Sequence, residues 1–197
     1  RGGSLYQDVA GAEDTQHTYW MYYGRTSGHG HKDTMNLGIE AYGLNIAPDV
    51  GYPSGTTGEI YTIWGQGSLI HNTVMVNQKS QKYVRDNTYP GKPMHYDGDG
   101  RVKLIDADAP DRYDEVSKYR RTVVSVAVDD EISYGVDFFR VTGGNEHQYN
   151  FHALTSLMPE TPGLTLTPQQ DADGNYVGSY AGANIPYQEP GVTSGFS

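Results

Sequence analysis

The chain alternates apolar and polar residues over many short runs, and Gly, Asn, Asp and Pro separate these runs. A period of two is typical of half-buried β-strands, whereas an amphipathic helix repeats its apolar residues every three to four positions. The clearest runs form two hairpins, 36–41 with 44–47 around Tyr42-Gly43 and 119–128 with 132–141 around Asp129-Asp130. These two hairpins predict antiparallel pairing.

Weaker alternation elsewhere indicates more strands of the same kind. They are expected at His17–Arg25, His71–Asn77, Arg101–Ala107 and His147–Leu154. Residues 1–16 are predicted to be a loop or an edge segment, loops are expected at 50–67 and 78–100, and a last hairpin is expected around Ala172–Asn175. Short strands without a helical pattern predict an all-β fold, a layered antiparallel β-sandwich or a barrel, with residues 1–197 as one domain.

Composition narrows the class of protein. The net charge of −10 argues against a nucleic-acid partner, which would require a basic surface. No stretch approaches the roughly 20 apolar residues of a transmembrane helix, so no membrane partner is expected. The chain has no cysteine, which excludes disulfides, thiolate zinc sites and a cysteine nucleophile.

Candidate chemistry lies between residues 29 and 71. His29 and His31 are two positions apart and would share one face of an extended strand. Asp49 and His71 follow, so the stretch offers two imidazoles and one carboxylate to a metal, with one imidazole to spare. Nitrogen and oxygen ligands of this kind suit Zn²⁺.

The spacing permits this site without requiring it. Strict pairing across the Tyr42-Gly43 turn places Asp49 opposite Asn36, so a bulge or bend near residues 32–34 is needed to bring Asp49 to His31. The alternative is that His31 and His71 are hydrogen-bonded interior histidines at strand ends. The remaining histidines are expected to be surface or hydrogen-bonded residues, with His152 either in the core or beside the site: His17, His95, His147 and His152.

The stretch from Tyr23 to Val76 resembles the heparinase II/III-like domain of polysaccharide lyases. The motifs that carry the resemblance are Gly-His-x-His-x-Asp-x-x-Asn-Leu at Gly28–Leu37, Pro48–Tyr52, and His71–Val74 followed by Gln78 or Gln81. Later strands of the family resemble Phe138–Gly144 and His147–His152, and the resemblance covers about residues 20–155.

The resemblance implies a polysaccharide lyase in which an α/α-toroid precedes the β-sandwich. Acidic polysaccharides are cleaved by β-elimination between the two parts. It further implies that His31, Asp49 and His71 hold a structural zinc, that His29 is a catalytic histidine, and that the protein is periplasmic or secreted. No helical toroid is visible in this sequence, so the chain corresponds to the sandwich, and the family's principal catalytic tyrosine would come from the toroid.

Two residues near the motif are candidates for binding the substrate. Arg25 could clamp a sugar carboxylate with two hydrogen bonds, or form a structural ion pair. Tyr23 could stack on a sugar, or pack in the core. Basic residues at 79, 82 and 85 either flank the cleft or belong to a solvated loop. An acidic run is expected to face solvent: Asp106, Asp108, Asp111, Asp114 and Glu115.

Two other kinds of protein are compatible with the sequence. A cupin-like metalloenzyme also uses a His-x-His pair in a β-barrel, but its glutamate lies a few residues after the pair, and Glu40 is too distant. A non-catalytic carbohydrate-binding β-domain would use tyrosine and tryptophan surfaces for stacking. The metal separates these possibilities, because a redox-active ion favours the cupin and glycan binding without a metal favours the binding domain.

Overall fold

The computed structural model describes residues 2–7, 17–24, 30–49, 65–83, 91–130, 132–154 and 162–165, with backbone alone for residues 2–7. The chain divides into two compact units, Arg1–Leu154 and Thr155–Ser197. All described strands lie in the first unit. None of the described segments contains a helix long and apolar enough to span a membrane.

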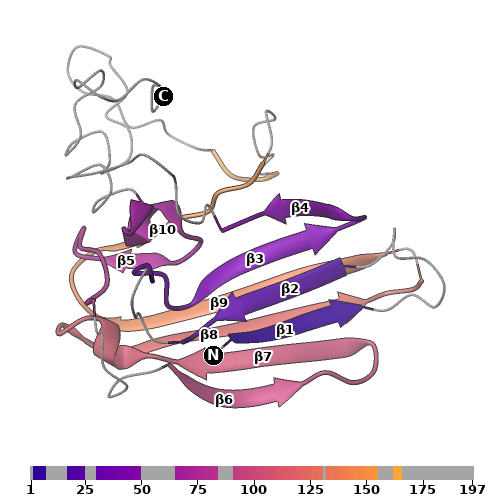
Figure 1. Cartoon of the computed structure of the whole chain (residues 1–197), viewed down its shortest axis with the longest axis horizontal. Helices are drawn as coiled ribbons and strands as arrows, with labels where there is room; N and C mark the ends of the chain where they lie inside the picture. Colours follow the sequence, from indigo (N-terminus) through magenta and orange to yellow (C-terminus); the bar gives the residue numbers. More distant parts are fainter. Residues whose placement is uncertain are drawn as a thin grey trace, which may run out of the picture. The chain divides into compact units, whose positions relative to one another are not determined.

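Two four-stranded antiparallel sheets dominate the first unit (Figure 1). One has the order β1-β2-β3-β4, with β1 at Gly2–Gln7, β2 at His17–Tyr22, β3 at Asn36–Ala41 and β4 at Leu44–Ala47. The other has the order β6-β7-β8-β9, with β6 at Lys92–Asp97, β7 at Val102–Asp108, β8 at Val116–Ala127 and β9 at Ser133–Gly143.

Shorter strands and 3₁₀ helices complete the described part of the first unit. A two-stranded sheet pairs β5 (Val74–Val76) with β10 (His147–Tyr149). Among the described residues, 3₁₀ helices occupy two connections, η3 at Ser68–Ile70 before β5 and η4 at Pro110–Arg112 between β7 and β8.

The core lies between the two large sheets. Met21 and Leu37 come from the first sheet, Ile105 and Val123 come from the second, and Tyr119 is completely buried among them. The sheets approach closely where β9 carries Gly135, since a Cβ atom there would lie 2.6 Å from the Tyr19 ring. The described unit is therefore a layered antiparallel β-structure, as the strand pattern predicts.

Both predicted hairpins are present. The β3–β4 turn falls at Tyr42 and Gly43, whose φ angles of 54° and 70° are those of a hairpin turn with two left-handed residues. The β8–β9 hairpin pairs Ala127 with Ser133 next to its turn and continues to Val116 opposite Gly143. Local alternation and turn residues suffice for these elements because their pairing partners are adjacent in the sequence.

The predicted loop at 78–100 is wrong in part, because it contains β6. All six residues of β6 are exposed, so the strand has no apolar alternation to reveal it. It lies at the edge of its sheet, where a proline is tolerated, and the register shifts between Pro93 and His95. The strands predicted at 17–25, 71–77 and 147–154 are shorter than expected. Residues 50–64 of the predicted loop at 50–67 and the hairpin around Ala172–Asn175 lie outside the described residues.

Candidate metal centre

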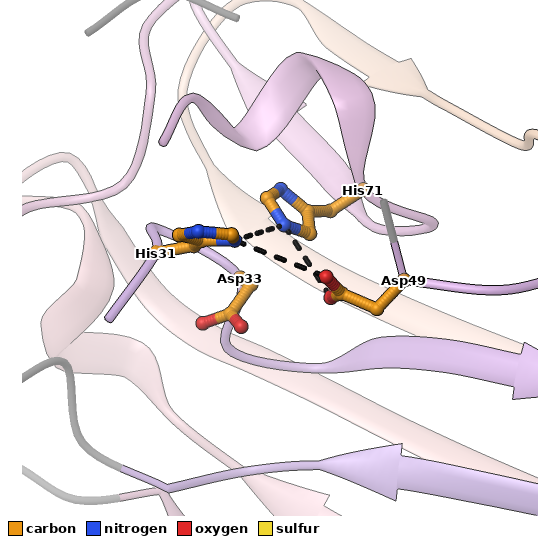
Figure 2. Close-up of side chains that lie close together, drawn as sticks. All are labelled: His31, Asp33, Asp49 and His71. Carbon is orange, nitrogen blue, oxygen red and sulfur yellow. Dashed lines mark hydrogen bonds and ion pairs between the residues drawn. The ribbon is translucent and has the colours of Figure 1, made fainter. Parts of the chain in front are cut away.

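Four side chains gather where three separate segments meet: His31, Asp33, Asp49 and His71 (Figure 2). Each offers one ligating atom, and these atoms all lie within 4.8 Å of one another. The first two residues belong to the connection before β3, Asp49 follows β4, and His71 follows η3. The three residues proposed from the sequence as metal ligands are therefore neighbours in space, together with a second aspartate.

The distances between donor atoms are those of a compact ligand set. The Nδ1 atom of His31 lies 3.2 Å from Nε2 of His71, and Asp49 oxygens lie 3.9 Å and 3.5 Å from these two nitrogens. Ligands about 2.0–2.1 Å from a tetrahedral zinc ion are separated from each other by about 3.3 Å. Only small shifts would bring these three groups to that spacing.

A sharp bend before β3 produces this arrangement. The amide N–H of Asn36 donates to the carbonyl of Asp33 over 2.8 Å, and Met35 has a φ of 72°. The Asn36 side chain donates to Asp49 over 2.9 Å. The sequence places Asp49 opposite Asn36 and requires a bend near 32–34 to reach His31. The structure has the bend, but the register of β3 and β4 shifts between Ile39 and Glu40, so the strict pairing is not kept and the Asn36 side chain makes the link to Asp49.

Asparagine side chains join the two histidine-bearing segments. The amide N–H of Asn72 donates to Oδ1 of Asn36 over 2.8 Å, and the Asn72 side chain donates to the carbonyl of Leu37 over 2.9 Å. Both asparagines are buried. Because Asn72 follows His71 directly, these bonds hold that histidine against the start of β3.

Gln81 is a second buried link between the segments. Its side chain accepts from the Thr34 N–H over 3.0 Å and donates to the Thr34 carbonyl over 2.8 Å. The hydroxyl of Ser68 bonds both the Lys32 carbonyl and the Gln81 N–H. Of the two glutamines that could belong to the family motif, Gln81 lies behind the site, and Gln78 bonds Glu146 at the surface.

Arg121, which shows no exposed surface, supports the site from β8. Its guanidinium donates to the carbonyls of Met35 and Asn72, next to the site on each segment. Asp137 on β9 pairs with the same guanidinium at 2.8 Å. One buried cation thus ties the metal-site loops to the second sheet.

The environment keeps both imidazoles neutral. Burial lowers the pKa of His71 to about 4, although the Asp49 charge and the hydrogen bond to Gly67 oppose this shift. Burial likewise lowers the pKa of His31, against the opposing charge of Asp49. The Nδ1 atom of His71 lies 2.8 Å from the carbonyl of Gly67 and donates to it, so the Nε2 lone pair faces the cluster.

Asp33 is the member of the cluster that sequence reasoning missed as a ligand. Burial and the nearby charge of Asp49 raise its pKa to about 7, while the charge of Arg112 acts in the opposite direction. Its Oδ1 atom is buried and has no hydrogen-bond partner in the described part of the chain. A buried carboxylate oxygen without a donor fits a site that holds a cation. Its position two residues after His31 is the one available sequence signal.

The other predicted site residues have different outcomes. His29 and Arg25 lie outside the described residues. Tyr23 is partly buried and packs against the hydrophobic core, which matches the packing alternative, and its contact with sugar remains a prediction. His152 is exposed instead of lying in the core, and its ring bonds the carbonyl of Leu69, two residues before His71.

The charged residues expected at the surface need one correction. Asp106 does not face solvent, because it is buried on β7 and pairs with Arg120 and Arg140. The Asp106 side chain lies on the sheet face that also carries the guanidinium groups of Arg120 and Arg140. Which side chains share a face depends on the register of the strands. Lysines 79 and 82 pair with acidic residues 115 and 114, and residue 85 lies outside the described residues.

Fold and site together define a layered all-β domain whose loops bring two histidines and two carboxylates to one point. Residues 21–194 match the family described as "Heparinase II/III-like, C-terminal". The chain belongs to this family, which confirms the resemblance seen in its motifs. A search of curated proteins found no match to the chain.

Solved structures of heparinases share the fold. The "Heparinase III-BT4657 gene product" has a TM-score of 0.63 and 19% identity over 80% of this chain, and a heparinase III has 0.56 and 18% over 77%. The heparan sulfate lyase HepC from Pedobacter heparinus has 0.55 and 14% over 71%. The chain spans only 24%, 23% and 22% of these three proteins, respectively.

Proposed function

We propose that the chain is the β-sandwich part of a polysaccharide lyase that cleaves a uronate-containing acidic polysaccharide by β-elimination. Membership of the heparinase II/III-like family supports the lyase class. The observation that carries the proposal is the meeting of His31, Asp49 and His71, which the family resemblance assigns to a structural zinc. An α/α-toroid of the same protein would complete the substrate cleft, and a periplasmic or secreted location is part of the proposal.

The residues present fit a zinc ion. His31 and His71 would offer neutral imidazole nitrogens and Asp49 a carboxylate oxygen, the ligand types that zinc accepts. When bound, the ion would supply a rigid cross-link between the segments before β3, after β4 and after η3. His29 lies two residues before His31, so this cross-link would restrict the backbone that carries His29.

Elimination from a uronate needs a base for the C5 proton and an acid for the O4 leaving group. Histidine suits this work because its ordinary pKa of about 6.5 permits both roles near neutral pH. We assign to His29 a part in this proton transfer, together with the catalytic tyrosine that the toroid would supply. Arg25 would neutralise the sugar carboxylate, which makes the C5 proton more acidic, and Tyr23 would contact the sugar ring.

The net charge of −10 repels a polyanion at long range, so cations close to the cleft must compensate. Lys79 and Lys82 already pair with Glu115 and Asp114. We therefore take Arg25, on the segment before the motif, as the first candidate cation for the uronate, with Arg85 as the second. Substitution of Arg25 should raise KM for charged substrates.

The test is an assay of the whole protein, toroid included, on heparan-type, chondroitin-type and alginate substrates, recording the ultraviolet absorbance of the unsaturated uronate product. His29→Ala should lower kcat by about 10²–10⁴-fold, the usual contribution of general acid–base catalysis. His95→Ala is the matched control, because His95 is exposed on β6. Full activity in His29→Ala would reject the assigned role.

A carbohydrate-binding domain and a cupin-like enzyme would give different results when the same purified protein is assayed. Glycan binding without an unsaturated product, and without a metal, would favour a carbohydrate-binding domain. Bound iron or manganese with redox activity would favour a cupin-like enzyme.

A further inference from the structure

Two charged side chains have polar atoms that are buried without a hydrogen-bond partner among the described residues. One is Asp33, through Oδ1, and the other is Arg112, through all three guanidinium nitrogens. Arg112 is only 1% exposed. The other buried charged groups of the same unit, such as Arg121 and Asp106, have full sets of ion pairs and hydrogen bonds.

Unpaired buried charges are expensive. The cost of an ion in a protein interior is several kcal/mol unless an opposite charge and hydrogen bonds compensate it. Buried polar groups without a partner therefore mark places where an ion, a water molecule or a small movement completes the structure. Asp33 and Arg112 carry opposite charges, so each could supply the ion-pair and hydrogen-bond partner that the other lacks among the described residues.

Hydrogen bonds place the two residues on the same scaffold. The carbonyl of Arg112 accepts from the N–H of Lys82 over 2.9 Å. The preceding residue, Gln81, holds Thr34 through both atoms of its amide. Thr34 follows Asp33 directly. The segment 81–82 thus joins the helix η4, which carries Arg112, to the bend that carries Asp33.

Asp33 also belongs to the metal cluster. One of its oxygens lies within 4.8 Å of the ligating atoms of His31, Asp49 and His71. Figure 2 shows its carboxylate beside the other three side chains, with no hydrogen bond joining it to them. A carboxylate has two oxygens, so one can face a metal while the other accepts from a guanidinium.

We propose that Asp33 is the fourth protein ligand of the metal centre and that Arg112 is the buried cation that holds Asp33 in its ligating position, directly or through one water molecule. The inference rests on the proposed zinc centre. Two imidazoles and two carboxylates make a complete tetrahedral set, and two carboxylates balance the charge of a divalent ion. A zinc site with four protein ligands has no open position for water or substrate, which is typical of structural zinc.

The first test uses the unaltered protein loaded with Co²⁺ in place of zinc. We expect the intense visible bands of four-coordinate cobalt, unchanged by added azide, because no position is free for an exogenous anion. A weak spectrum of higher coordination, or bands that shift with azide, would overturn the four-ligand assignment without any substitution.

The second test compares variants by zinc competition with a chromophoric chelator. Asp33→Asn should weaken zinc binding by more than about 100-fold, since loss of a ligand exceeds the 10–100-fold effect of outer partners. Arg112→Gln should weaken it by about 10–100-fold, with Arg112→Lys recovering part of the loss. Asp130→Asn and Arg101→Gln, both exposed, are the matched controls.

The outcomes separate this inference from the proposed function. Zinc binding by the unaltered protein, with an unchanged affinity and cobalt spectrum in Asp33→Asn, overturns the fourth ligand and leaves the three-residue centre intact. Equal loss in Arg112→Lys and Arg112→Gln overturns the charge role of Arg112. Failure of the unaltered protein to bind zinc overturns both the centre and this inference. Circular dichroism of each metal-free variant establishes that it is folded, and the cobalt test needs no variant.

Discussion

The ring nitrogens Nδ1 of His31 and Nε2 of His71 lie 3.2 Å apart, although 40 residues separate the two histidines in the chain. Both rings are buried, and burial keeps both neutral. Together with the adjacent Asp49 and Asp33 carboxylates, the two neutral imidazoles make up the proposed ligand set for a metal ion.

The purified protein, dialysed without chelator, is expected to retain about one zinc ion per chain, measured by elemental mass spectrometry. His31→Ala should lose it, and zinc should no longer raise the thermal midpoint of that variant. His95→Ala should keep the zinc. Iron or manganese in place of zinc, or no metal, would contradict the proposed centre.

Gln81 and Gln78 provide a matched pair of substitutions. Gln81→Ala should lower the free energy of unfolding by about 1–3 kcal/mol, because it removes two hydrogen bonds from the buried backbone of Thr34. Gln78→Ala should stay within about 0.5 kcal/mol, since its partner Glu146 is at the surface. Urea unfolding of both variants measures the difference. Similar losses in the two would contradict the placement of Gln81 behind the site.

Arg121→Met should be among the most damaging single changes in this unit. It leaves Asp137 without its guanidinium partner and removes donors from the carbonyls of Met35 and Asn72. Breaking a buried ion pair by removing one partner costs about 3–5 kcal/mol. Arg101→Gln, exposed near the β8–β9 turn, should cost less than about 1 kcal/mol in the same denaturant experiment.

Gly143→Ala tests the end of β9. Gly143 has a φ of 104°, and a Cβ atom there would lie 2.1 Å from the backbone carbonyl oxygen of Glu115. A backbone atom cannot rotate away as a side chain can, so the strand end must shift. We expect a loss of about 1–3 kcal/mol on thermal or urea unfolding. Gly100→Ala, also at positive φ but with open space around it, separates the strain of the φ angle from the clash.

Asp106 should make stability depend on pH in the acid range. Burial raises its pKa, but the hydrogen bonds from Arg120 and Thr122 and the charges of Arg120 and Arg140 outweigh burial and leave the pKa below its ordinary value. Its contribution is therefore full above the unfolded pKa of about 3.9 and is lost as the pH falls through the lower folded value.

Asp106→Asn removes this contribution. The difference in unfolding free energy between the unaltered protein and the variant should be about 1–3 kcal/mol at pH 7 and should shrink below about pH 4. A difference that stays constant between pH 7 and pH 2.5 would show that the carboxylate charge is not what stabilises the fold.

Much of the site could be predicted from the sequence, because the motif order names His31, Asp49 and His71. Strict pairing across one hairpin places Asp49 opposite Asn36, but the register of β3 and β4 shifts between Ile39 and Glu40, and the two residues are instead joined through their side chains at 2.9 Å. Asp33 was visible in the motif but not recognisable as a member of the cluster. Nothing in the sequence indicates that Arg112 is buried, since a Pro-Asp-Arg turn is ordinarily exposed.

Local sequence is enough to predict the strands whose partners are neighbours in the chain, with the turns at Tyr42-Gly43 and Asp129-Asp130, since short-range pairing depends on local alternation and turn residues. The sequence also shows which residue types are available to bind a metal. The position of β6 at a sheet edge and the burial of Asp106 and Arg112 follow from the packing of distant segments. Burial depends on which distant surface covers a residue, and this is decided when the sheets pack together.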